Sequence, residues 1–183
     1  SFTASEEIGT PVVTFQSGGA AVMDSSVVYS NTSGNTWTAV YTTNPSDTDG
    51  VITYSIAFSD IAGNAGTPVT NGSGSVTADT TVPSLSAVSI SSNNTNRSMA
   101  TPTDVVTLSF TASETIQSPT VTFSSGGAAV TDSSVVYSNT TGNTWTAVYT
   151  ANANDTAGTV SYSIAFSDTA GNAGIAVTAT TDT

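Results

Sequence analysis

The sequence predicts an all-β chain made of two tandem antiparallel β-sandwiches. Three observations lead to this fold class. Apolar and hydroxyl residues alternate with a period of two in many short segments, as in strands with one buried face. The apolar residues are mainly Val, Ile, Phe, Tyr and Trp, which favour strands, and leucine occurs only at Leu85 and Leu108. The chain also repeats itself over long stretches, and no segment shows helical periodicity.

The internal repeat aligns residues 1–75 with residues 109–183 without a gap, at an offset of 108 residues. Of these 75 positions 53 are identical, and Trp37 falls on Trp145. A gap-free repeat of this length indicates tandem copies of one module. Because an immunoglobulin-like sandwich has roughly 100 residues, each copy is predicted to be one such Greek-key domain without helices.

The second copy contains the fuller strand pattern. Its strands are expected, in order, at 84–91, 104–113, 119–123, 134–138, 143–150, 159–167 and 175–181, with a short extra strand or two around "SSGGAAV". In the second of these strands Val106, Leu108, Phe110 and Ala112 share one face. Hydroxyl residues occupy the other face, which predicts an antiparallel sheet with one side in water.

The predicted domains are residues 1–80 and residues 81–183. The first copy begins within its second strand, and the second copy ends within its last strand. Sandwiches without those strands would expose apolar surface and unpaired backbone groups. We therefore expect the chain to be a section of a longer array. The alternative is that neighbouring chains complete the sheets by strand addition.

The composition argues against several classes of function. The chain has 13 acidic residues, one basic residue (Arg97) and a net charge of −12, which argues against binding to nucleic acid or to an anionic membrane. No apolar run approaches the roughly 18 residues of a membrane span. Cysteine and histidine are absent, which excludes disulfides, zinc ligation by these residues and histidine-based catalysis. We expect no catalytic residues and no enzyme.

Several motifs carry a resemblance to a known family. "SFTASE", "NTWTAVYT", "SIAFSDTAGNAG" and the linker "ADTTVP" resemble the bacterial immunoglobulin-like repeats of giant surface adhesins and biofilm-associated proteins. The resemblance implies an extracellular, cell-surface location and a rigid, calcium-stiffened stalk or fibre. Its partners would be neighbouring repeats and an unknown surface ligand. The alternatives are a subunit of a polymeric filament or sheath, or a carbohydrate-binding module with exposed aromatic residues.

An acidic chain attracts cations, and one group of oxygen ligands is predicted to converge. Glu114 ends the second strand, and Asp168 and Asn172 lie in the hairpin after the sixth. These two strands run in the same direction, so they end at one pole, where the linker with Asp79 also enters. We therefore predict an interdomain calcium site. The corresponding residues of the first copy are Glu6, Asp60 and Asn64. The alternative is that "D-x-A-G-N" is simply a turn sequence.

Six N-x-S/T sequons are candidate glycosylation sites if the protein is exported where such modification occurs. They are Asn31, Asn71, Asn93, Asn96, Asn139 and Asn154. Trp37 and Trp145 are expected to pack between the sheets of their sandwiches rather than to stack on sugars.

Overall fold

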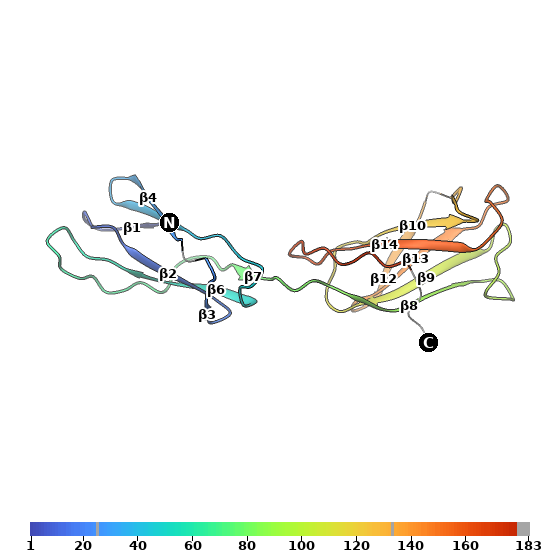
Figure 1. Cartoon of the computed structure of the whole chain (residues 1–183), viewed down its shortest axis with the longest axis horizontal. Coiled ribbons are helices and arrows are strands. Elements are labelled where there is room, and N and C mark those ends of the chain that lie inside the picture. Colours follow the sequence, from blue (N-terminus) through green and yellow to red (C-terminus); the bar gives the residue numbers. More distant parts are fainter. Residues whose placement is uncertain (25, 133, 179–183) are drawn as a thin grey trace. The chain divides into compact units, whose positions relative to one another are not determined.

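A computed structural model describes residues 1–24, 26–132 and 134–178. The chain divides into two compact units, Ser1–Thr81 and Val82–Thr183 (Figure 1). All regular elements of the described residues are strands, which confirms the predicted all-β class. None of the described segments is a helix long and apolar enough to cross a membrane.

The first sheet of the second unit has four antiparallel strands. They are β8 (Leu85–Ser92), β9 (Val105–Ala112), β12 (Val136–Thr141) and β13 (Thr144–Thr150), in the order β12-β13-β9-β8. In the central pair β9 faces β13 from Val105, opposite Thr150, to Thr111, opposite Thr144. The sequence-based bounds of β9 and β13 are correct to within one residue at each end. The strand predicted at 134–138 instead begins at Val136 and continues to Thr141.

The second sheet of this unit is built around β10 (Thr120–Ser125) and β14 (Val160–Ala165). The short strand β11 (Ala128–Ala129) pairs with the far side of β10, giving the order β11-β10-β14. Beyond β14, isolated bridges join Ile164 to Val177 and Ser167 to Ala173. The bridge at Val177 lies within the last predicted strand, of which residues 179–181 are outside the described part of the chain.

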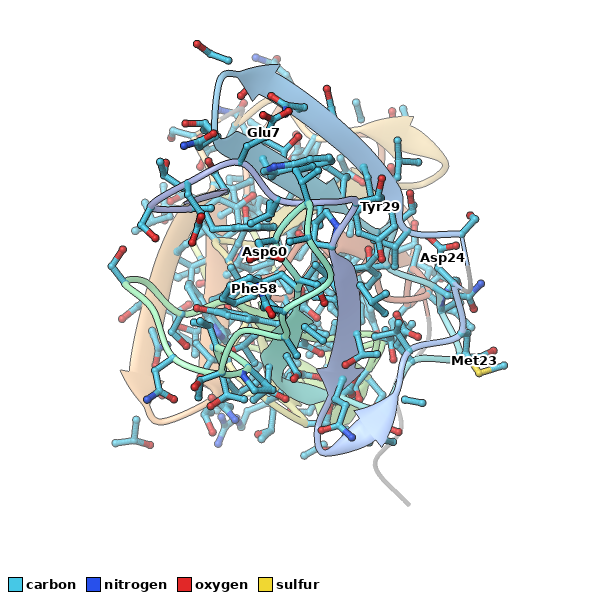
Figure 2. All side chains as sticks on the ribbon, turned by 90° about the vertical axis from the view of Figure 1, so that its left-hand side faces the viewer. Glu7, Met23, Asp24, Tyr29, Phe58 and Asp60 are labelled. Atoms are coloured by element: carbon cyan, nitrogen blue, oxygen red, sulfur yellow. The ribbon has the colours of Figure 1, made fainter. Side chains whose placement is uncertain are left out.

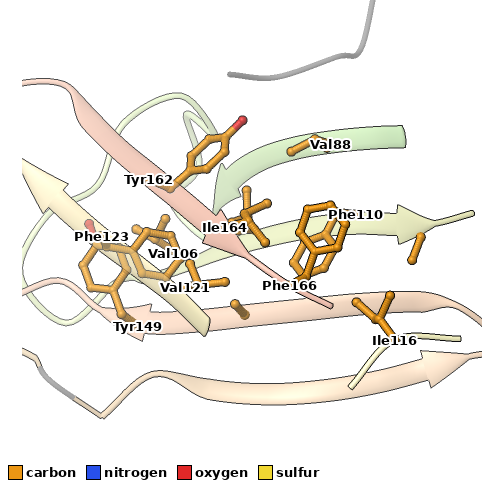
Figure 3. Packing of buried hydrophobic residues seen from close by; sticks show 13 residues of the cluster. Val88, Val106, Phe110, Ile116, Val121, Phe123, Tyr149, Tyr162, Ile164 and Phe166 are labelled. Carbon is orange, nitrogen blue, oxygen red and sulfur yellow. The ribbon is translucent and has the colours of Figure 1, made fainter. Parts of the chain in front are cut away.

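The inward faces of the two sheets enclose one apolar core (Figure 3). The alternating face of β9 is buried as predicted, and Leu108 and Phe110 are 0% exposed. Phe123 of β10 and Tyr149 of β13 come from opposite sheets, and their ring centroids lie 4.8 Å apart. The second unit is therefore a two-layer sandwich. Trp145 is only half-buried and packs against the margin of this core.

Strand β8 contains a bulge where the alternation of its apolar residues changes phase, between Ala87 and Val88. Its pairing with β9 shifts by one residue between Ser86 and Ser89, and Ala87 has a φ of 48°. An extra residue in one strand increases the local twist and redirects the side chains that follow. After the bulge, Val88 points into the core and is 0% exposed.

The first unit repeats this two-sheet arrangement, with the two-residue strand β1 in the place of β9. One sheet contains β1 (Phe2–Thr3), β5 (Thr36–Val40) and β4 (Val28–Ser33), in the order β1-β5-β4. The other contains β2 (Val12–Ser17), β3 (Ala20–Ala21), β6 (Gly50–Ala57) and β7 (Thr77–Ala78), in the order β3-β2-β6-β7. Within the described residues of this unit, no strand occupies the position that β8 has in the second unit.

A tyrosine ties the two sheets together along one side of each unit. In the second unit the Val121 N–H donates to the Tyr137 hydroxyl oxygen (2.9 Å), and the hydroxyl donates to the Val121 carbonyl (3.4 Å). Tyr29 and Val13 make the same pair of contacts in the first unit. The hydroxyl thus satisfies backbone groups of β10 and β2 that no neighbouring strand pairs with.

Candidate metal centre

The hairpin after β14 places one carboxylate at the end of the second unit's sandwich. The Gly174 N–H donates to the Phe166 carbonyl (3.0 Å), and the Asp168 N–H donates to the Asn172 carbonyl (3.1 Å). Gly174 is required because a Cβ there would collide with Cε2 and Cζ of the Phe166 ring. Glycine therefore lets the phenyl ring pack directly over the hairpin that carries Asp168.

The Asp168 side chain is fully buried and lies inside its own turn. Its Oδ1 accepts the backbone N–H of Gly171 (2.7 Å) and of Asn172 (2.8 Å), and its Oδ2 accepts the Asn172 side-chain amide (2.8 Å). Burial alone would raise the pKa of Asp168, but these hydrogen bonds outweigh it and hold the pKa below its ordinary value of 3.8. Asp168 is therefore a buried carboxylate that stays ionised at neutral pH.

Glu114 approaches Asp168 from the other sheet of the same unit. The segment after β9 joins the hairpin: Ile116 forms a bridge with Asp168, and the Gln117 N–H donates to the Ser167 carbonyl (2.9 Å). One carboxylate oxygen of Glu114 lies within 4.8 Å of one of Asp168. Two like charges at this distance repel each other, and a cation between them would remove that repulsion.

Asp79 belongs to the first unit, directly after β7. Its Oδ1 accepts the Thr81 N–H (3.1 Å). Asp49 holds the same segment: its Oδ1 accepts the Thr80 N–H (2.6 Å), and its Oδ2 accepts the Thr81 hydroxyl (2.5 Å). The last residues of the first unit are thus fixed to the loop before β6. Asp49 has no acidic counterpart in the second copy, where Ala157 stands.

The corresponding residues of the first unit form a looser arrangement. The Asp60 carboxylate accepts the Asn64 N–H (2.8 Å) and the Asn64 side-chain amide (2.7 Å), as in the second unit. Asp60 and Phe58 both lie just after the end of β6 (Figure 2). Asp60 is half-buried, whereas Asn64 and Glu6 are exposed. Among the described residues, no third carboxylate of this unit joins Glu6 and Asp60 in a metal-sized group.

In both units the hydrogen bonds give the aspartate and the asparagine of "D-x-A-G-N" a turn-forming role. The asparagine amide donates to the aspartate carboxylate in each copy. The two interpretations of this motif are therefore compatible, because the turn itself positions Asp168 beside Glu114.

Two further pairs of aspartates hold loops by accepting backbone N–H groups, and the sequence analysis did not predict them. Asp24 accepts the backbone N–H of Ser26 and Thr42, and Asp132 accepts those of Ser134 and Thr150. Asp47 and Asp155 form a second such pair, each accepting two backbone N–H groups. Each pair recurs at the 108-residue offset beside turn residues, and this recurrence is the sequence signal for them. We call these four aspartates the loop clamps.

The other sequence candidates lie on the surface. All six sequon asparagines are exposed: Asn31, Asn71, Asn93, Asn96, Asn139 and Asn154. Two of them already hold loops, since Asn93 Oδ1 accepts the Val105 N–H (2.9 Å) and Asn96 Oδ1 accepts the Ser98 hydroxyl (2.8 Å). Trp37, like Trp145, is half-buried.

Comparisons with protein families, with curated proteins and with solved structures give no match for this chain.

Proposed function

We propose that the chain is a structural segment of tandem immunoglobulin-like repeats that acts as a rigid extracellular spacer, in the stalk of a large cell-surface adhesin or in a fibre. The observation that carries this proposal is the use of one module twice. Phe2 faces Trp37 in the first unit as Phe110 faces Trp145 in the second. A module that repeats its register as well as its sequence is suited to linear arrays, whose length grows with the number of repeats.

The strand order supports the immunoglobulin-like part of the proposal. If the strands of the second unit are lettered in chain order, β8, β9, β13 and β12 form a sheet equivalent to A-B-E-D. Strands β10 and β14 and the segment at Val177 form a sheet equivalent to C-F-G, with β11 as a short additional strand beside C. This is the strand partition of a constant-type immunoglobulin sandwich. Such a domain keeps its two ends at opposite poles, so it can be joined to the next domain through a short linker.

We also propose that Asp79 joins Glu114 and Asp168 in binding calcium. The chain enters the second unit beside Glu114, because the Ser84 N–H donates to Ser113 Oγ (3.0 Å) and the Ser113 N–H donates to the Ser84 carbonyl (2.9 Å). Asp79 precedes Ser84 by only five residues. The donors are all carboxylate oxygens, which suit Ca²⁺ and do not suit softer metals. The bound ion would offset the repulsion between the carboxylates and stiffen the junction.

Calorimetric unfolding of the whole chain in calcium and in a chelator tests the metal. Calcium at 100 times its dissociation constant is expected to stabilise the folded state by about 2.7 kcal/mol. Glu114→Gln should abolish the shift in melting temperature. Glu6→Gln, at the equivalent position of the first copy, is the matched control and should keep it. An unchanged melting temperature of the parent chain would refute the calcium site while leaving the spacer role standing.

Electron microscopy of the native material tests the spacer role. For a stalk we expect single linear arrays of domains that are attached to cells and do not contact one another along their length. Regular lateral contacts between chains would instead favour the polymeric filament or sheath, in which the hydroxyl-rich faces would meet neighbouring copies.

A further inference from the structure

An exposed segment of the first unit connects two stretches that pair with β6. Val69 bonds to β6 through both of its backbone groups (2.9 and 3.0 Å), and the Val76 carbonyl accepts an N–H of the same strand (2.8 Å). Residues 70–75 between them belong to no strand, and all of them are exposed. Within the described part of the chain, the Gly72 N–H donates no hydrogen bond. The backbone nitrogen of Gly72 is therefore not held by a neighbouring strand.

Asn71 and Gly72 form the only Asn-Gly pair in the sequence. In such a pair the backbone nitrogen of the glycine can reach the side-chain carbon Cγ and close a five-membered ring, and no Cβ hinders its approach. The Thr70 hydroxyl donates to Asn71 Oδ1 (3.1 Å). This bond makes Cγ more electrophilic, and it stabilises the negative charge that Oδ1 gains when a nucleophile adds. Three consecutive residues thus contribute a hydrogen-bond donor, a reactive carbon and an attacking nitrogen.

Packing requires the glycine at position 72. A Cβ there would collide with the Tyr54 hydroxyl oxygen. Tyr54 belongs to β6 and is half-buried, so a larger residue at position 72 would have to displace its ring. The contact with Tyr54 therefore keeps an unhindered nitrogen directly after Asn71.

Other asparagines are held in ways that oppose the same ring closure. Asn31 lies within β4 and is followed by the β-branched Thr32, whose side chain crowds the nitrogen. Asn44 precedes a proline, whose nitrogen carries no proton. Asn64 donates its side-chain amide to a carboxylate (2.7 Å), and the next residue, Ala65, forms a bridge. Asn71 differs from these residues in its glycine neighbour and in its hydroxyl donor.

We propose that Asn71 and Gly72 form a self-modification site, at which Asn71 is converted to aspartate or isoaspartate. The Gly72 nitrogen gives its proton to water and bonds to Asn71 Cγ. The bond from Cγ to Nδ2 then breaks, and Nδ2 takes up a proton and leaves as ammonia. A water molecule from the solvent opens the cyclic imide that remains. Opening at Cγ gives aspartate, and opening at the backbone carbonyl carbon gives isoaspartate. The sum is an amide plus water giving an acid plus ammonia, with no change of oxidation state.

The reaction competes with glycosylation for the same atom. Asn71 is also the asparagine of a sequon, and a sugar would be attached to the Nδ2 that otherwise leaves as ammonia. A glycan that is attached first blocks the loss of ammonia, and an acid that forms first cannot be glycosylated. Either acid adds a negative charge to the first unit. The proposal depends neither on the spacer role nor on calcium.

Peptide mass spectrometry of the whole chain, made in a host without N-glycosylation and aged in mildly alkaline buffer, tests the site. We expect Asn71 to lose its amide about tenfold faster than Asn31, or more, because Thr32 hinders attack on Asn31. Isoaspartate should appear at position 71. Asn71→Gln is the matched control and should give no product, because its ring would need one more atom.

Substitution of Thr70 tests the structural part of the proposal. Thr70→Ala should slow the reaction by about fivefold, the effect of one hydrogen bond on a rate. Thr70→Ser keeps a hydroxyl and should keep the parent rate. In guanidinium, where the chain is unfolded, the parent and Thr70→Ala should react equally fast, because the hydrogen bond depends on the folded segment.

Each of three results would overturn the proposal. One is an Asn71 amide that survives as long as that of Asn31. Another is an equal rate for Thr70→Ala and the parent in the folded chain, which would remove the donor from the site. The third is a faster reaction in guanidinium than in the folded parent, which would show that the fold protects Asn71.

Discussion

At the scale of the residue, Asp168 shows how a buried carboxylate is kept charged without a basic partner. Its three hydrogen bonds come from the turn that it organises, so the turn and the charge stabilise each other. Because the pKa of Asp168 is lowered in the folded state, its contribution to stability is present above the unfolded pKa of about 3.8. That contribution is lost as the pH falls through the folded pKa.

The first prediction concerns this acid dependence. In the presence of a chelator, Asp168→Asn should lower the free energy of unfolding of the second unit at pH 7, because the amide nitrogen faces N–H donors. The difference between parent and variant should shrink as the pH falls below 3.8, the pKa of the unfolded carboxyl, and should be lost below the lower pKa of the folded state. Urea unfolding from pH 7 to pH 2.5 measures it, with Thr169→Ala in the same hairpin as the control. A difference that stays constant over this range would contradict the charged state.

At the scale of the element, the duplication separates the effect of sequence from the effect of neighbours. Ala39 and Tyr41 are half-buried, whereas the identical Ala147 and Tyr149 are buried in the core. The two segments share the sequence "NTWTAVYT". Only the strands beside them differ. The presence of β8 and of the first half of β9 therefore accounts for the burial and for the greater length of β13.

Gly66 and Gly174 give a matched pair of substitutions. Gly174→Ala should destabilise the second unit by about 1–3 kcal/mol, because the new methyl group displaces the buried Phe166 ring. Gly66→Ala should cost the first unit less, because the half-buried Phe58 ring borders an apolar groove of about 170 Å³ and can move into it. Chemical unfolding of each variant measures the two costs. Equal costs would show that the groove gives the ring no freedom.

The sequence predicted those features that depend on local pattern. The alternation in β9 predicted its buried face, and the common direction of β9 and β14 predicted that Glu114 would meet Asp168. The prediction of one uninterrupted strand at 84–91 missed the bulge at Ala87, although the sequence contains a signal for it: the apolar residues of "SLSAVSIS" change phase between Ala87 and Val88. The hydrogen bonds of Asp24 to Thr42 and of Asp132 to Thr150 also depend on backbone groups 18 residues further along the chain.

At the scale of the whole molecule, the two units differ in the size of their cores. The extended cluster of buried apolar residues lies in the second unit. The first unit buries fewer of the equivalent side chains, because its sheet of three strands leaves one face open. Hydrophobic stabilisation increases with the apolar area removed from water. The second unit should therefore be the more stable.

Heating the chain should accordingly give two transitions, with the first unit unfolding at least about 5 °C below the second, as expected for a difference of about 1 kcal/mol in a domain of this size. Calorimetry would resolve them. Tryptophan fluorescence assigns them: Trp145→Phe leaves Trp37 as the reporter of the first unit, and Trp37→Phe leaves Trp145. A single transition, or a higher midpoint for the Trp37 reporter, would contradict this order.

Because the carboxylates pair with backbone N–H groups rather than with basic side chains, the stability of the folded units should depend on ionic strength in an unusual way. Thirteen acidic side chains share the chain with one guanidinium, so mutual repulsion outweighs attraction between unlike charges. Dissolved salt screens both kinds of force. In this chain salt weakens the repulsion among the carboxylates, and there is almost no attraction between acidic and basic side chains for it to weaken. We therefore expect the folded units to gain stability at high ionic strength, under which a domain stabilised by surface ion pairs loses stability.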